Sequence, residues 1–273
     1  TGMSSWDYWA LAAILLAGVP HGGFDGAVAR RAGWSQRPFD WLVFHAGYVV
    51  LAALVTTVWW YQPAASLAVF LAISAIHFGS SDVRAVTPPW QAACALPLAA
   101  HCGLVCIGIP GLQPHLVEPL FAILVGADAS LWLLETITLL LPAWLLAVVA
   151  YAAYAVFEAR WRAPVSVLIA LVAAAYWLPP LVSFALYFCF VHSPSHSLRI
   201  WRSLLPEHRR RCVIEAVCYT LAAWITGLSL LLWYQNNHSF DLDSALLQLT
   251  FIGLAALTVP HMILVDVIDR KHG

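Results

Sequence analysis

The chain has 273 residues, of which 62% are apolar and 10% are charged. Soluble domains are about 45–50% apolar and about 25% charged, so this composition excludes an ordinary soluble domain and predicts an all-α integral membrane protein. The formal net charge of −1 says little about a chain buried in lipid, but the sequence contains no basic stripe, which argues against a nucleic-acid partner.

The apolar stretches predict a helix bundle of about nine membrane spans, within a range of eight to ten, because a span needs about 20 residues. A further stretch, 114–126, is too short to cross and is expected to be re-entrant or interfacial. We expect one membrane domain over 1–273, with Thr1 and Gly2 as an artificial extension ahead of a native start at Met3. The predicted spans are 5–29, 39–60, 64–82, 90–109, 129–157, 163–178, 180–198, 212–234 and 243–268.

The basic residues follow every second predicted span, and the alternate connections contain no Lys or Arg. By the positive-inside rule, nine crossings with the N-terminus outside place every basic residue in the cytoplasm. Joining 163–178 and 180–198 into one span would place the later basic connections outside. The basic residues are Arg30, Arg31, Arg37, Arg84, Arg160, Arg162, Arg199, Arg202, Arg209, Arg210, Arg211, Arg270 and Lys271.

Five histidines fall late in spans that run from outside to inside. This topology therefore predicts a layer of imidazoles in the cytoplasmic half of the bilayer, with His45 at the same level. Polar groups at membrane depth are costly, face the bundle interior and mark function by default. The five are His21, His77, His192, His196 and His261.

The most specific part of this layer is the pair His192 and His196, four residues apart, which places both imidazoles on one helix face. Pro194 is expected to bend the helix between them. Acidic residues near the histidines are candidates to accept a hydrogen bond from a ligating ring, as metal-bound histidines usually require. The candidates are Asp25, four residues after His21, together with Asp82 and Asp266.

The cysteines form no Cys-x-x-Cys pair, so neither a disulfide framework nor a thiolate metal site is predicted. An all-histidine site is the simplest assignment. Four imidazoles leave open positions on an iron that prefers six ligands, whereas a four-histidine zinc site would be closed and structural. The ligands alone do not separate these metals.

At these residues the chain resembles the Brp/Blh family of membrane-bound β-carotene 15,15′-dioxygenases. The resemblance covers essentially the whole chain. It implies a non-haem Fe(II) that uses O₂ to cleave the central 15,15′ double bond of β-carotene into two molecules of all-trans-retinal. It further implies His21, His77, His192 and His196 as metal ligands, with His261 as a fifth ligand or a neighbouring group. The matching motifs are Pro20-His21-Gly-Gly-Phe-Asp25, Ile76-His77-Phe-Gly-Ser-Ser-Asp82, His192-Ser-Pro-Ser-His196 and Pro260-His261.

The resemblance also implies β-carotene, O₂ and membrane lipid as partners, a bacterial or archaeal cell membrane as the location, and a rhodopsin as a recipient of retinal. Two other classes of function stay open from the residues alone: a bis-histidine haem electron carrier and a transporter of metal ions or protons. A rhodopsin itself is excluded, because its Schiff base needs a lysine within the membrane and Lys271 lies in the tail.

Overall fold

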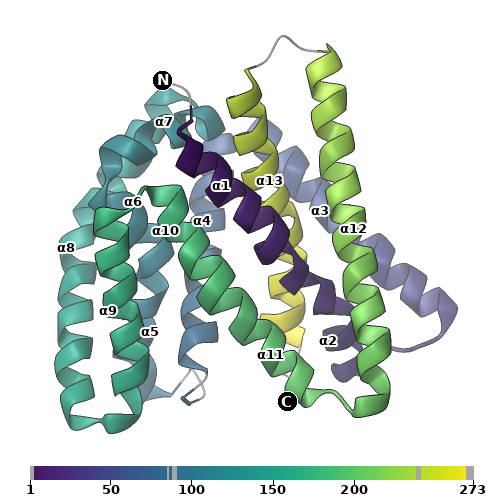
Figure 1. The fold of residues 1–273 in the computed structure, drawn as a ribbon, viewed down its shortest axis with the longest axis horizontal. Helices are drawn as coiled ribbons and strands as arrows, with labels where there is room; N and C mark the ends of the chain where they lie inside the picture. Colours follow the sequence, from purple (N-terminus) through teal and green to yellow (C-terminus); the bar gives the residue numbers. More distant parts are fainter. Residues whose placement is uncertain (1–2, 85, 88–90, 238–240, 269–273) are drawn as a thin grey trace. The chain divides into compact units, whose positions relative to one another are not determined.

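The computed structural model describes residues 3–84, 86–87, 91–237 and 241–268, and every regular element within these ranges is a helix (Figure 1). The all-α prediction is confirmed for this part of the chain. Four residues used in the sequence predictions lie outside the described ranges: Thr1, Gly2, Arg270 and Lys271.

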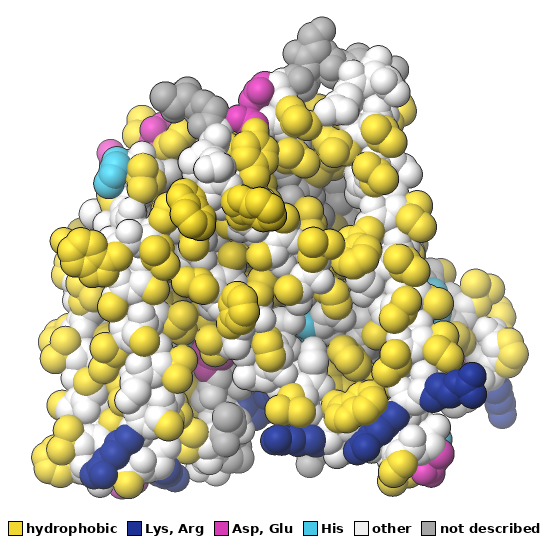
Figure 2. Space-filling view, in the orientation of Figure 1, with side chains coloured by type: hydrophobic (Ala, Val, Ile, Leu, Met, Phe, Trp, Pro, Cys, Tyr) yellow, Lys and Arg dark blue, Asp and Glu magenta, His cyan; other side chains and the backbone are white. Residues whose placement is uncertain are grey.

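Eight helical segments are long and apolar enough to cross a membrane, which supports a multi-pass membrane protein. Large apolar side chains are exposed on their surfaces, as lipid contact requires, and hydrophobic side chains are spread over the visible face in Figure 2. The eight match eight of the nine predicted spans. They are Ser5–Arg31, Pro38–Tyr61, Pro63–Val83, Ala95–Leu112, Ala127–Phe157, Ala159–Trp177, Pro206–Asn236 and Leu242–Asp266.

The ninth predicted span, 180–198, is helical but is absent from these eight segments. Its second half contains two histidines and three serines, which lower its apolar character. The count of nine crossings and the orientation of the termini therefore stay predictions. The short stretch expected at 114–126 is a separate helix, α7 (Pro114–Val125), of 12 residues.

The described helices group into two compact units. Unit 1 comprises Leu11–Ser66 and Ser193–Gly273 with the first three residues, and unit 2 comprises Ser4–Ala10 and Leu67–His192. The prediction of a single membrane domain stays a prediction. Unit 1 contains η1 (Ile14–Gly18), η2 (Val19–Phe24), α2 (Asp25–Arg31), α3 (Pro38–Tyr61), α11 (Ser193–Ser203), α12 (Pro206–Asn237), α13 (Leu242–Met262) and η7 (Ile263–Ile268), while α1 (Ser5–Ala13) begins in unit 2 and ends in unit 1.

Unit 2 is built mainly around one long helix, α8 (Ala127–Phe157), which contacts α5 (Ala95–Gly103), α6 (Ile109–Leu112), α7 and α9 (Arg162–Trp177). Its elements are most of α4 (Pro63–Val83), then η3 (Ala92–Cys94), α5, η4 (Leu104–Gly108), α6, α7, α8, η5 (Ala159–Trp161), α9, α10 (Pro180–Tyr187) and η6 (Phe188–His192). The indole of Trp144 on α8 donates a hydrogen bond to the Ala100 carbonyl at 2.8 Å. Gly103 and Gly108 leave the space that this ring fills.

In unit 1, α12 packs along η2 and α2, and α13 packs along α3. Small apolar side chains of α2, together with Ile200, Cys212, Leu264 and Val265, form a buried cluster under α2. The Arg31 guanidinium also donates to the Ser203 hydroxyl at 3.2 Å. The basic connection after α2 and the end of α11 therefore lie at the same end of unit 1, as the predicted topology requires.

Single turns of π-helix adjoin four histidines of the described chain. These turns are η1, η4, η6 and η7, which lie beside His21, His101, His192 and His261 respectively. A π-helical turn inserts one extra residue and changes the direction in which later side chains point, and such turns are frequent at functional sites. The backbone irregularities of this fold are thus concentrated beside its histidines.

Candidate metal centre

Three histidine rings come together inside unit 1. His21 comes from η2, His196 from α11 and His261 from the last turn of α13. Their ring centroids lie 5.6 Å (His21–His196), 5.1 Å (His21–His261) and 5.0 Å (His196–His261) apart, with interplanar angles between 65° and 86°. Imidazoles that share one metal at a metal–nitrogen distance of about 2.1 Å have centroids about 5 Å apart, so this spacing suits a common ligand group.

Prolines place these histidines at irregular points of their helices. Pro20 lies in the first turn of η2, and α11 begins at Ser193, directly before Pro194 and after the π-turn η6. The change of helix type therefore occurs where the sequence predicted a bend. Pro260 lies inside α13, one residue before His261. Since proline removes a backbone donor, each histidine lies where the helical hydrogen-bond ladder is interrupted.

Two of the three rings have their Nδ1 atom engaged by an oxygen. His261 Nδ1 lies 2.6 Å from Asp25 Oδ1, and His21 Nδ1 lies 2.5 Å from the Gly18 carbonyl oxygen. In each pair Nδ1–H donates, which leaves Nε2 as the nitrogen that would face a metal. Asp25 was expected to serve His21 on its own helix face, but the carboxylate reaches His261 on α13 instead.

Unit 2 contains a second pair of buried histidines, His77 on α4 and His192 at the end of η6, with ring centroids 5.1 Å apart. Their exposed fractions are 2% and 1%. Phe78 packs edge-on against His192 at 4.6 Å, and Phe188 stacks on it at 6.0 Å. Aromatic side chains therefore surround His192 and exclude water from it.

Asp82 makes contacts other than the ones expected from the sequence. Its Oδ2 accepts a hydrogen bond from the Tyr187 hydroxyl at 3.0 Å and another from His101 Nδ1 at 3.1 Å. We expected Asp82 to support His77, five residues before it. The five-residue separation places it on a different part of the α4 surface, where it ties α4 to α5 and α10.

Replacing Tyr187 by phenylalanine is expected to destabilise the protein by about 1–3 kcal/mol, because the partly buried carboxylate of Asp82 loses a donor. The measurement is thermal unfolding in detergent. Tyr176→Phe is the matched control in the same unit, since Tyr176 is 59% exposed and its hydroxyl can be hydrated. Equal stability of the two variants would contradict the importance of the Asp82–Tyr187 bond.

His45 lies outside the cluster of His21, His196 and His261, which we call the three-ring cluster. Its Nδ1 donates to the Trp41 carbonyl at 2.7 Å, and its Nε2 accepts from the Tyr219 hydroxyl at 2.7 Å. Tyr219 belongs to α12, where Glu215 forms a bidentate pair with Arg30. Both ring nitrogens of His45 therefore form hydrogen bonds to other residues. Its predicted depth in the membrane, shared with the other histidines, does not by itself make it a metal ligand.

The donor set fits a divalent first-row metal by its chemistry, since neutral imidazoles suit iron, zinc and copper. Among the described residues, no three His, Cys, Asp or Glu side chains are gathered tightly enough to hold a metal ion as they stand. The fit of these histidines to a metal therefore rests on the spacing of the rings of His21, His196 and His261, and on the hydrogen bonds that hold the Nδ1 atoms of His21 and His261. The ligand set His21, His77, His192 and His196 stays a prediction, as do the roles of His261 and Asp25.

Sequence reasoning missed three polar residues of these networks: His101, Tyr187 and Tyr48. His101 lies within a predicted span, so its membrane depth was a usable signal. The two tyrosines had no such signal, because aromatic residues are common throughout these helices. The Tyr48 hydroxyl lies 2.9 Å from Asp25 Oδ2 and 3.1 Å from the Leu257 carbonyl oxygen.

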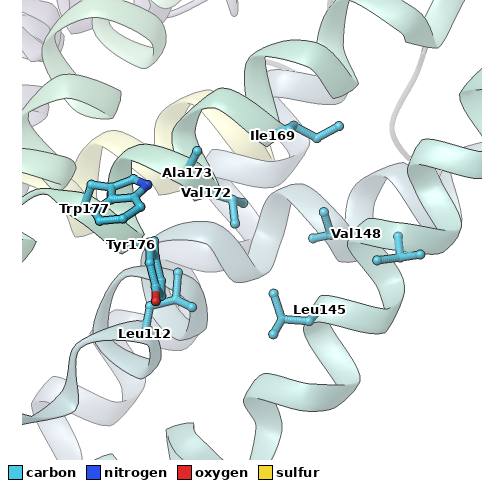
Figure 3. Close-up of a pocket in the computed structure, with 9 residues that line it drawn as sticks. Leu112, Leu145, Val148, Ile169, Val172, Ala173, Tyr176 and Trp177 are labelled. Carbon is cyan, nitrogen blue, oxygen red and sulfur yellow. The ribbon is translucent and has the colours of Figure 1, made fainter.

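An apolar recess of about 420 Å³ lies within unit 2 between α8 and α9, with Leu112 of α6 at its edge (Figure 3). The side chains of Leu145 and Val148 on α8 and of Ile169 and Val172 on α9 point into it. Tyr176 and Trp177 supply its few polar atoms. A lining of this kind accommodates hydrocarbon and offers almost nothing to a polar ligand.

The chain is similar to known proteins of one family over almost its whole length. The model of the β-carotene 15,15′-dioxygenase family matches residues 12–269. The chain belongs to the β-carotene 15,15′-dioxygenase family. A β-carotene 15,15′-dioxygenase from an uncultured marine bacterium, 66A03, is 34% identical over 99% of this chain and 97% of its own length. A probable β-carotene 15,15′-dioxygenase from Halobacterium salinarum is 28% identical over 96% of this chain and 84% of its own.

No solved structure matches the chain. Membership of the β-carotene 15,15′-dioxygenase family makes the protein an enzyme, a carotenoid-cleaving dioxygenase. The resemblance noted in the sequence is thereby confirmed. The haem electron carrier and the transporter are set aside, since neither is a member of this family.

Proposed function

We propose that the protein cleaves the central 15,15′ double bond of β-carotene with O₂ and releases two molecules of all-trans-retinal. Each retinal takes one oxygen atom, so one β-carotene and one O₂ account for all atoms of the products. The observation that carries the proposal is the cluster of His21, His196 and His261, in a chain that belongs to the dioxygenase family.

The cofactor of this proposal is a non-haem Fe(II), which supplies the activation of O₂ when it is bound. We propose His21, His77, His192 and His196 as its ligands, on the strength of the motif resemblance and the short spacing of His192 and His196 in sequence. His261 joins them as a fifth ligand, because its ring lies with those of His21 and His196 and its Nδ1 is held by Asp25.

The surrounding residues have three tasks in this reaction. Asp25 keeps the proton of His261 on Nδ1, which leaves Nε2 to the metal. The rings of Phe78 and Phe188 exclude water from His192 and offer apolar contact to a polyene. The apolar helix surfaces suit a substrate that is dissolved in lipid. Selection among the many similar double bonds then depends on how the chain positions the polyene.

The proposed location is a bacterial or archaeal cell membrane, with the N-terminus outside and the C-terminus in the cytoplasm. The basic connections carry this orientation, through the positive-inside rule. Membrane lipid would surround the helices, and retinal released into it would be available to a rhodopsin.

Product analysis tests the reaction independently of the metal. Detergent-purified protein is incubated with β-carotene in air and, in parallel, without oxygen. The expected result is two all-trans-retinal molecules for each β-carotene consumed in air, and none without oxygen. Longer and shorter fragments in equal amounts would place the cleavage at another bond, and retinal formed without oxygen would contradict an O₂-dependent reaction.

A further inference from the structure

Tyr48 has an unusual place on α3, whose surface is otherwise largely exposed and whose one buried residue is Trp59. Its hydroxyl lies within hydrogen-bond distance of two other elements, Asp25 at the start of α2 and the Leu257 carbonyl on α13. A carboxylate is the stronger acceptor of the two, so the hydroxyl donates to Asp25. Leu257 lies four residues before His261, so both contacts lead toward the same histidine.

The two oxygens of Asp25 receive different donors. Oδ1 accepts from His261 Nδ1 at 2.6 Å, and Oδ2 accepts from the Tyr48 hydroxyl at 2.9 Å. The terminal torsion of an aspartate side chain is broad, so one hydrogen bond alone does not fix the plane of the carboxylate. A second donor on the opposite oxygen fixes this plane. The fixed carboxylate plane then sets the orientation of the His261 ring. Asp25 is 3% exposed and His261 is 2% exposed, so solvent does little to weaken this chain of bonds.

We propose that Tyr48 is a positioning residue of the metal centre, which acts through Asp25 to orient His261 and to keep its Nε2 toward the metal. The inference rests on the proposed function, because it requires that His21, His196 and His261 bind a metal. It adds a residue on α3 to the cluster of His21, His196, His261 and Asp25, which come from η2, α11, α13 and α2. Outer partners of metal-bound histidines commonly change metal affinity by about 10–100-fold.

The same unit provides a matched control in Tyr219. Its hydroxyl also donates a hydrogen bond within unit 1, in this case to His45 Nε2 at 2.7 Å, and that histidine lies outside the three-ring cluster. Tyr219→Phe therefore removes the same hydroxyl group from a hydrogen bond that does not lead to the three-ring cluster. A general loss of packing or stability would affect both variants, whereas an effect through the metal centre would affect Tyr48→Phe alone.

The experiment titrates metal-free protein with Co²⁺, whose visible absorption reports both the affinity and the geometry of its ligands. The variants are Tyr48→Phe, Tyr219→Phe, Asp25→Asn and the double variant Tyr48→Phe/Asp25→Asn. We expect Tyr48→Phe to weaken Co²⁺ binding about tenfold and to change the visible spectrum, with Tyr219→Phe within about twofold of the parent protein. In the Asp25→Asn background, Tyr48→Phe should have almost no further effect, because it acts through that carboxylate.

Three results would overturn the inference. Unchanged Co²⁺ affinity and spectrum in Tyr48→Phe would leave the proposed function intact and remove the role of Tyr48. Additive effects of Tyr48→Phe and Asp25→Asn would show that Tyr48 acts by another route. Parent protein that cleaves β-carotene but binds no Co²⁺ at histidines would remove the metal centre, and with it both this inference and the proposed cofactor.

Discussion

Replacing His196 by alanine is expected to abolish β-carotene cleavage, with a loss of turnover of more than about 100-fold. His196 is buried in the three-ring cluster, and its removal takes away a ligand, which should cost more than the 10–100-fold typical of outer partners. The measurement is retinal formation by purified variants at equal protein concentration, with bound metal determined on the same samples.

His45→Ala is the control for this experiment. His45 is also an intramembrane histidine of unit 1, but its two nitrogens are bonded to Trp41 and Tyr219. Its replacement should lower stability modestly and leave turnover per folded molecule within a few-fold of the parent protein. Full activity in His196→Ala, or an equal loss in both variants, would contradict the assignment of the cluster as the metal centre.

Gly23→Ala is expected to be severely damaging, although Gly22→Ala beside it is expected to be tolerated. A Cβ on Gly23 would lie 2.7 Å from the carbonyl oxygen and 2.8 Å from the Cα of Ala216, so η2 and α12 would have to separate. A Cβ on Gly22 would have no atom within 4 Å. Overpacking of this kind costs about 1–3 kcal/mol. Moving η2 also moves His21, and a displacement of about 1 Å in a reacting group can cost about 100-fold in rate.

Gly22→Ala is the control that separates the contact of Gly23 with α12 from the general effect of an added methyl group. Both variants add the same methyl group to the same 3₁₀ turn, so helix propensity is matched, and only the contact with α12 differs. Thermal unfolding in detergent and retinal formation are measured for each. If Gly22→Ala were as damaging as Gly23→Ala, the approach of η2 to α12 would not be the cause.

The all-α class could be predicted from the sequence, and so could the eight helices that are long and apolar enough to cross a membrane, because apolar length is a local property of the chain. The expected span 180–198 is not among these helices. Its first half is apolar, but its second half contains the two histidines and three serines, which lower the apolar character of the whole helical stretch. The sequence alone also could not predict the division into two units, in which His192 and His196, only four residues apart, belong to different units.

The histidines of the candidate site could also be chosen from the sequence, since a polar group within an apolar span is conspicuous. Their hydrogen-bond partners could not, because those contacts depend on how distant helices pack. Asp25 was matched to His21 by spacing along one helix, whereas it bonds to His261, 236 residues away in sequence. Asp82 bonds to Tyr187 and His101 for the same reason. Spacing along a helix predicts which side chains share a face, but not what that face meets.

The metal content of the purified, catalytically active protein tests the histidine metal centre most directly. We expect close to one iron for each chain, lost together with retinal formation in His21→Ala and His196→Ala and retained in His45→Ala. Protein that forms retinal at full rate with no iron, or that holds its iron unchanged in both ligand variants, would contradict the histidine metal centre.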